Sequence, residues 1–172
     1  MKNRTGKLGA GIPVLLLLLL PACGRQAAVL DPEREKAAIR DVIVKETTAY
    51  YKQDYATWKS TYVAKPYFRE HGYWDGYPEK VRIYNSFAEL DSLKKKQFDD
   101  NKTVWQTAEV TRSNENFRIY GDVAWYTSDQ VSTDRNTGKL LGKSVDIRIL
   151  EKEKGEWKIA YLGFYYLPLE KK

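Results

Sequence analysis

The hydrophobic pattern of the chain changes its period near Thr103, and this change restricts the fold more than any other feature. Before Thr103, apolar residues such as Ile39, Val42 and Ile43 recur at the three- and four-residue spacing of an amphipathic helix. After Thr103, apolar and polar residues alternate, as they do in strands with one buried face. Helices followed by strands predict an α+β fold, with N-terminal helices packed on a strongly curved, mostly antiparallel sheet.

Capping residues and turns indicate where these elements begin and end. Asp31-Pro32 predicts the start of a long helix that continues to about Gln53, because Asp is a good N-cap and Pro fits the first helical position. Asp54 can cap a short second helix, and Ser86 can start a third helix that ends near residues 99–101. Strands are expected at 67–74, 103–112, 116–120, 123–131, 140–151 and 156–165.

The first 22 residues are typical of a secretory leader. Lys2, Arg4 and Lys7 precede the apolar run Ile12–Leu20, which ends in six leucines. A membrane-spanning helix needs about 20 apolar residues, and this run is much shorter. We therefore expect residues 1–22 to be a signal peptide that is translocated and removed.

The junction Leu20-Pro21-Ala22-Cys23 resembles the bacterial lipobox. The resemblance implies that Cys23 is acylated and anchors the exported protein to a membrane of the bacterial cell envelope, in the periplasm or at the outer surface. Two or three acyl chains hold a protein firmly on a bilayer, whereas one does not. Residues 23–32 would then be a short tether and 33–172 one α+β cone domain. The alternative is an ordinary buried thiol beside a conventional cleavage site.

The distribution of charge argues against a nucleic-acid partner. The net charge of the whole chain is +6, but Lys2, Arg4 and Lys7 leave with the leader, so 29 basic residues become 26 against 23 acidic ones. The remaining charges alternate in sign instead of forming a basic stripe. The triplet Lys94-Lys95-Lys96 is expected to be a solvated face of the third helix.

The order of the elements resembles the SnoaL-like and nuclear-transport-factor-two-like superfamily over residues 33–167. The supporting residues are Tyr50 with Asp54 and Trp58, Gly121-Asp122-Val123-Ala124-Trp125, Leu150-Glu151-Lys152 and Gly155-Glu156-Trp157-Lys158-Ile159-Ala160. The resemblance implies a cone with a blind pocket and a homodimer through the outer face of the sheet. It implies no particular reaction, because such domains include isomerases, cyclases, dehydratases and proteins without chemistry.

One carboxylate falls inside the apolar stripe of the first helix. Glu46 must therefore point toward the core or a cavity, where an unpaired charge would be costly. Asp146 and Arg148 share one face of a later strand, and if that face looks into the cone, Arg148 neutralises both carboxylates and leaves a polar floor for a ligand. Two other interpretations are a purely structural ion-pair cluster and an outward-facing group at a dimer interface.

His71 is the only histidine in the chain and could transfer protons, since its reference pKa is about 6.5. It could equally be a strand-end histidine that is exposed or bonded to a backbone carbonyl. A single histidine without further cysteines makes no conventional zinc site. No phosphate loop, dinucleotide fingerprint or nucleophile elbow is present in the sequence, so neither a metal nor a cofactor is expected.

The chain is rich in aromatic residues, with 13 Tyr, 5 Trp and 5 Phe. Tyr50, Trp58, Trp74 and Trp125 are candidates for the aromatic surface of a pocket, although aromatic residues at such spacings also build ordinary cores. The leading hypothesis is a lipid-anchored domain that binds a small hydrophobic or aromatic molecule.

Two further hypotheses remain open. The first is a cofactor-independent isomerase, dehydratase or cyclase with Glu46 or His71 as general base and Tyr50 or Arg148 stabilising an oxyanion. The second is a protein-interaction module that uses the sheet face. Convergence of Glu46, His71 and Arg148 in one cavity would favour the enzyme.

Overall fold

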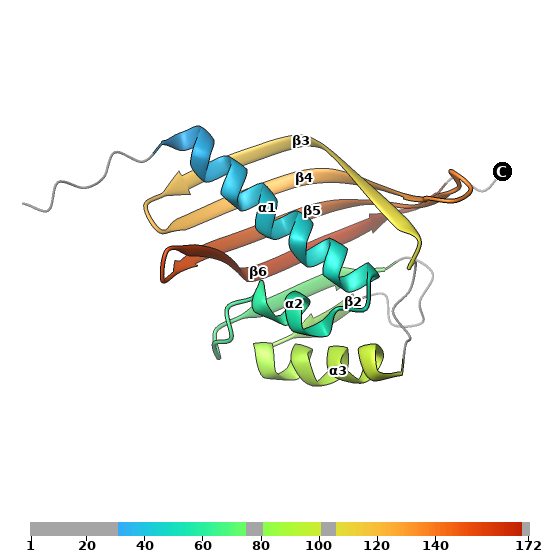
Figure 1. The fold of residues 1–172 in the computed structure, drawn as a ribbon, viewed down its shortest axis with the longest axis horizontal. Coiled ribbons are helices and arrows are strands. Elements are labelled where there is room, and N and C mark those ends of the chain that lie inside the picture. The colour runs from blue at the N-terminus through green and yellow to red at the C-terminus, as the bar shows by residue number, and fades with distance from the viewer. Residues whose placement is uncertain (1–30, 75–80, 101–105, 170–172) are drawn as a thin grey trace, which may run out of the picture.

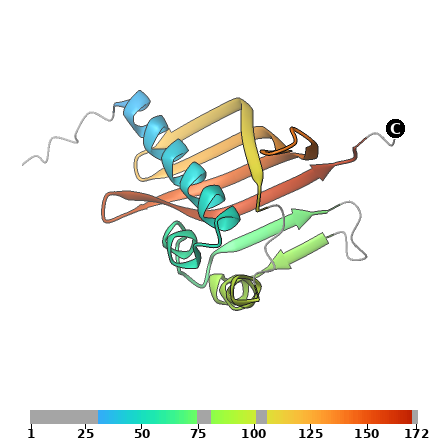
Figure 2. The same cartoon turned by 45° about the vertical axis from the view of Figure 1, so that its right-hand side comes forward.

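Six strands form one curved sheet, and three helices cover its concave face (Figures 1 and 2). The computed structural model describes residues 31–74, 81–100 and 106–169. The leader, Cys23, most of the tether and the first residues of the strand expected from Thr103 lie outside the described residues. The predicted α+β fold of helices on a mostly antiparallel, curved sheet is confirmed.

Each helix begins at a residue that caps it through its own side chain. Asp31 accepts hydrogen bonds from the backbone N–H groups of Glu33 and Arg34, Asp54 accepts from Thr57, and Ser86 accepts from Glu89. These bonds satisfy donors that the first turn of a helix leaves free. The helices are α1 (Pro32–Tyr51), α2 (Tyr55–Ser60) and α3 (Phe87–Asp99).

The sheet has the strand order β2-β1-β6-β5-β4-β3. The strands are β1 (Arg69–Tyr73), β2 (Val81–Tyr84), β3 (Ala108–Tyr120), β4 (Val123–Asp134), β5 (Leu140–Glu153) and β6 (Glu156–Leu167). All neighbours are antiparallel except β1 and β6, which are parallel. The long strands β3 to β6 form a meander. The short strand β1 pairs with the other edge of β6, and β2 pairs with β1.

Two details of the sheet differ from the sequence-based expectation. The segments 103–112 and 116–120 were expected as separate strands. Residues 106 and 107 form a turn instead, and β3 then runs from Ala108 to Tyr120 as one strand with a bulge between Ser113 and Asn116. Asn114 adopts a φ of 52° in this bulge, a conformation that Asn tolerates better than most residues. Strand β2 was not expected. Its apolar residues Val81 and Ile83 are exposed, so it carries no buried apolar face that a pattern could reveal.

The concave face of the sheet is apolar at one end and polar at the other. In β4 and β5 the buried pairs Ala124–Leu150 and Tyr126–Arg148 are followed by Ser128–Asp146 and Gln130–Ser144. The apolar end packs against the first part of α1, where Ile39 and Ile43 are almost completely buried. The polar end lies where the second part of α1 crosses the sheet, which places the hydrophilic floor of the cone beneath that helix (Figure 1).

The helix α1 has 20 residues, but it is amphipathic and rich in charge. Over the described ranges, the structure contains no helix that is both long enough and apolar enough to cross a bilayer.

Candidate functional site

A cavity of about 140 Å³ lies between the C-terminal half of α1 and the polar end of the sheet. Lys94 of α3 and Trp74, which directly follows β1, also line it. Its lining consists of Glu46, Thr47, Tyr50, Tyr51, Trp58, Tyr62, Glu70, Trp74, Lys94, Gln130, Ser132, Ser144, Asp146, Arg148, Leu162, Phe164 and Tyr166. The lining therefore combines aromatic walls with a set of buried charged groups.

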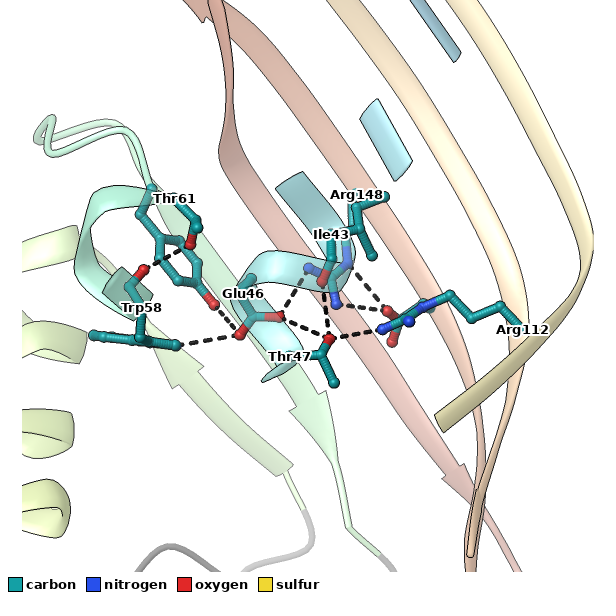
Figure 3. Close-up of polar contacts among 9 residues, drawn as sticks. Ile43, Glu46, Thr47, Trp58, Thr61, Arg112 and Arg148 are labelled. Atoms are coloured by element: carbon teal, nitrogen blue, oxygen red, sulfur yellow. Dashed lines mark hydrogen bonds and ion pairs between the residues drawn. The ribbon is translucent and has the colours of Figure 1, made fainter. Parts of the chain in front are cut away.

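Arg148 of β5 is the centre of a buried ion-pair network (Figure 3). Its Nε and Nη2 atoms donate to Oδ2 of Asp146 over 3.0 Å and 2.8 Å, and its Nη1 atom donates to Oε2 of Glu46 over 3.2 Å. Arg148 is 4 % exposed, Asp146 3 % and Glu46 8 %, so all three charged side chains are shielded from bulk water. Burial acts to lower the pKa of the Arg148 guanidinium, but Asp146 and Glu46 together outweigh it, and the pKa is raised above its usual value.

Both carboxylate oxygens of Glu46 accept hydrogen bonds from neighbouring side chains. Its Oε1 atom accepts from the Tyr62 hydroxyl over 2.9 Å and from Nε1 of Trp58 over 3.2 Å (Figure 3). Burial acts to raise the pKa of Glu46, but Arg148 and the Tyr62 hydroxyl outweigh it, and the pKa is lowered. Glu46 is thus held ionised and fully hydrogen-bonded, which suits an anchor for the network better than a proton acceptor.

A second cation extends the network to β3. Nη2 of Arg112 donates to Oγ1 of Thr47 over 2.6 Å, and Thr47 donates to Glu46 over 3.3 Å (Figure 3). Burial and the neighbouring charge of Arg148 lower the pKa of Arg112. In contrast, burial raises the pKa of Asp146 even though Arg148 opposes it.

Glu70 of β1 is a buried carboxylate that the sequence analysis did not single out. It is 3 % exposed and lines the cavity, and within the described residues it makes neither a hydrogen bond nor an ion pair. Burial raises its pKa to about 7; the Lys94 ammonium opposes this shift, and the nearby Glu46 carboxylate reinforces it. Glu70 is therefore the lining group that changes its protonation near neutral pH.

Lys94 of α3 also lines the cavity, which corrects the expectation that the whole lysine triplet is solvated. The reason is helical spacing, because Lys94 lies four residues from both Leu90 and Phe98, which are buried. Its ammonium lies 4.6 Å from the centre of the Tyr50 ring. Burial acts to lower the pKa of Lys94, but Tyr50 and Glu70 are among the groups that more than offset it, so the pKa is raised and the side chain stays charged.

Six of the residues singled out in the sequence meet at this cavity. They are Glu46, Tyr50, Trp58, Trp74, Asp146 and Arg148. Trp58 is only 1 % exposed and packs among core aromatic rings, so it presents its indole N–H to Glu46 more than a stacking surface to a ligand.

Two residues singled out in the sequence are not part of the cavity lining. His71 alternates with the buried residues Glu70 and Gly72 along β1, so it faces the convex side of the sheet, where Nδ1 lies 3.4 Å from the Tyr161 hydroxyl. Trp125 lies between the inward-facing Ala124 and Tyr126 and is 37 % exposed on the same outer side. The structure therefore separates His71 from Glu46 and Arg148. Across the described ranges, no group of three His, Cys, Asp or Glu side chains is arranged to hold a metal ion.

No protein-family model matches the sequence, and no characterised protein matches it significantly. Solved structures do resemble the fold. A protein of unknown function with a cystatin-like fold from Nostoc punctiforme superposes with a TM-score of 0.63 at 16 % identity, over 78 % of this chain and 92 % of that one. A candidate dehydratase of the NTF2-like family from Streptomyces avermitilis gives 0.57 at 13 % identity, over 80 % and 99 %.

A third similar structure is a candidate ketosteroid isomerase from Shewanella frigidimarina, with a TM-score of 0.51 at 19 % identity over 74 % of this chain and 94 % of that one. At such low identity these likenesses carry information on the fold alone. They show that the chain has the NTF2-like α+β cone fold, which is also described as cystatin-like.

Proposed function

We propose that this chain is an exported bacterial lipoprotein whose NTF2-like domain binds a small molecule in the cavity beneath α1. The observation that supports the binding function is the cavity itself. It has aromatic walls, and its lining includes Glu70 and Lys94, which form no ion pair with the Arg148 network. Ligand sites typically combine apolar walls with a few directed polar groups. The ligand thus has polar groups as well as the aromatic or hydrophobic character expected from the sequence.

A ligand screen by thermal shift tests the binding function. Ligands that bind only the folded state raise the melting temperature of the purified chain. The shift should vanish in Ser144→Leu, which fills the floor of the cavity, and persist in Lys143→Leu, whose exposed side chain precedes it on β5. A shift that survives in Ser144→Leu would place the ligand elsewhere.

The anchor rests on the sequence of residues 1–23. Labelling of cells with a fatty-acid analogue should mark the wild type and fail in Cys23→Ala, which should also leave the membrane fraction. Cys23→Ala that stays acylated, or a wild type that takes up no label, would contradict the anchor.

A second candidate function is cofactor-independent proton transfer, as in an isomerase or dehydratase. Glu70 favours it, because a buried carboxylate with a pKa of about 7 and no competing hydrogen bond within the described residues is suited to general-base catalysis. Two structures with the same fold are described as a candidate isomerase and a candidate dehydratase. Glu70 would then be the general base, the role that the sequence suggested for His71 or Glu46.

Exchange of α-protons in small ketones, followed by NMR in deuterated water, tests the enzyme. Wild type should accelerate the exchange and Glu70→Gln should not, whereas His71→Ala should match wild type because His71 lies on the other face of β1. If wild type gives no acceleration over buffer, the binding function stands alone.

We also propose that the convex face of the sheet mediates a homodimer. Trp125 lies opposite Ile149 across β4 and β5, and each is 37 % exposed; Val123 and Tyr165, each 43 % exposed, lie on the same side. Sedimentation analysis should find a dimer that Trp125→Arg converts to a monomer. A wild-type monomer would remove this proposal.

A further inference from the structure

The cavity contains two charged side chains whose charges are not matched by a partner. Within the described residues, Lys94 contacts the ring of Tyr50 but forms no ion pair, and Glu70 forms neither a hydrogen bond nor an ion pair. Both line the same cavity, and each shifts the pKa of the other through its charge. A half-buried ammonium and a buried carboxyl group without an ion-pair partner represent a cost that a bound ligand can offset.

The charge balance indicates the sign of that ligand. Glu46 and Asp146 are balanced by Arg148 and Arg112, so this network contributes no net charge to the site. Lys94 then leaves one positive charge when Glu70 is protonated and none when Glu70 is ionised. The site with a protonated Glu70 is therefore complementary to an anion with a single charge, and it opposes a cation.

The walls and the volume indicate the shape of the ligand. Trp74 and Phe164 pack edge to face with 4.3 Å between their ring centres, and Tyr50 and Tyr166 complete an aromatic lining. The cavity volume of about 140 Å³ is close to the volume of roughly 150 Å³ that accommodates a benzene ring in a protein core. A single aromatic ring is thus a suitable body for the ligand.

We propose that the cavity binds a small aromatic monocarboxylate, whose oxygens accept hydrogen bonds from the Lys94 ammonium and from the protonated carboxyl group of Glu70. This rests on the proposed binding function and specifies its ligand class. The ionised form of Glu70 repels the ligand carboxylate, so binding and protonation occur together. At a pH above the pKa of Glu70, each bound ligand therefore takes up one proton from solvent, whereas at a pH below it Glu70 already carries that proton.

The groups that face Glu70 set the pH range of this coupling. They are Glu46 on α1, Tyr62 after α2, Tyr84 on β2, Lys94 on α3, and Asp146 with Arg148 on β5. In the free protein, burial raises the pKa of Glu70 to about 7. A bound carboxylate raises the pKa further, because it accepts a hydrogen bond only from the protonated form. Affinity is therefore full below this pKa and declines as the pH rises through it.

Calorimetric titration of the purified full chain with benzoate, benzamide and benzylamine tests the proposal. Benzoate should bind about tenfold more weakly at about pH 8 than at about pH 6, because one proton is linked to binding across that range. Benzamide should show little pH dependence, and benzylamine should bind least. Titrations of benzoate at about pH 8 in two buffers of different ionisation enthalpy should show net proton uptake, a measurement that needs no variant.

Two variants separate the roles of the pair. Glu70→Gln retains a donor but cannot titrate, so benzoate should still bind and its affinity should become independent of pH. Lys94→Met should weaken benzoate about tenfold or more and leave benzamide nearly unchanged. Lys96→Met, two positions further on α3 and exposed, is the matched control and should behave as wild type.

Other outcomes overturn the proposal in distinguishable ways. If benzamide or benzylamine binds and benzoate does not, the anionic ligand class is wrong while the cavity remains a binding site. If benzoate binds without proton uptake, or Lys94→Met leaves its affinity unchanged, the assigned contacts are wrong. If none of the three probes binds, the monocarboxylate assignment fails, and the thermal-shift screen with Ser144→Leu then decides separately whether the cavity binds any ligand.

Discussion

Arg148 on β5 holds Glu46 on α1 at 3.2 Å, and this buried ion pair joins the helix layer to the sheet across 102 positions of sequence. The pair lies where the apolar part of the core ends and the cavity begins. It therefore has two consequences. It ties α1 to β5, and it keeps the floor of the cavity polar while the two charges of the pair neutralise each other.

Removal of the Glu46 charge should destabilise the protein. Glu46→Gln leaves Arg148 with one carboxylate in place of two in a buried position, and we expect the free energy of unfolding to fall by about 3 kcal/mol. Denaturant unfolding monitored by circular dichroism measures the change. Glu109→Gln, an exposed carboxylate on β3, is the control and should match wild type. Equal stabilities of the two variants would contradict a role of the ion pair in holding α1.

The hydroxyl group of Tyr62 should contribute through the same carboxylate. Tyr62→Phe removes a buried hydrogen bond of 2.9 Å to ionised Glu46 and should lower the unfolding free energy by about 2 kcal/mol. Tyr67→Phe, which removes a hydrogen bond to Glu151 at the exposed surface, should have little effect. The double variant Tyr62→Phe/Glu46→Gln should lose less than the sum of the single variants, since both remove one interaction. Strict additivity would show that the two residues act independently.

Strand alternation made it possible to predict that Asp146 and Arg148 share one face of β5. Val145, Ile147 and Ile149 alternate with Asp146 and Arg148, so the two charged residues had to share a face. Glu46 followed from helical periodicity in the same manner. Local periodicity does not show whether the charged face of β5 points inward; that depends on α1, which supplies the carboxylate that neutralises Arg148.

Glu70 and Lys94 were harder to identify because their inward positions depend on packing between distant segments. His71 and Glu70 are neighbours on β1, so one must face the cone and the other must face outward. Strand β1 pairs in parallel with β6, and this pairing places Glu70 beside the buried Leu162 on the inner face. Local sequence does not reveal such a crossover. A signal was present in Phe68, an apolar residue two positions before Glu70 on the same face. The spacing of Lys94 from Leu90 and Phe98 was a comparable signal on α3.

Glu70 should make stability depend on pH in the opposite direction to an ordinary paired carboxylate. Its pKa in the folded state is raised to about 7, so the folded protein holds this proton more tightly than the unfolded chain does. Stability attributable to Glu70 is therefore highest at acidic pH and is lost as the pH rises through about 7. Wild type should be roughly 1 kcal/mol more stable at about pH 6 than at about pH 8 relative to Glu70→Gln, in which this titration is absent. Denaturant unfolding of both proteins at the two pH values gives the difference, and parallel pH profiles would refute the assigned pKa.

Gly72→Ala should disturb the aromatic wall of the cavity. A Cβ atom at this position would lie 2.3 Å from the Trp74 indole and 2.7 Å from the Phe164 ring, closer than packed atoms approach. We expect a loss of about 1–3 kcal/mol in the free energy of unfolding, which is typical of overpacking, and a shifted tryptophan emission as the indole moves. Gly163→Ala on β6 is the matched control, because its Cβ would lie 3.0 Å from the Tyr161 hydroxyl and 3.2 Å from the ring, and it should cost less. Unchanged emission together with full stability in Gly72→Ala would mean that Trp74 does not lie against this backbone, and the aromatic wall assigned to the ligand site would have to be redrawn.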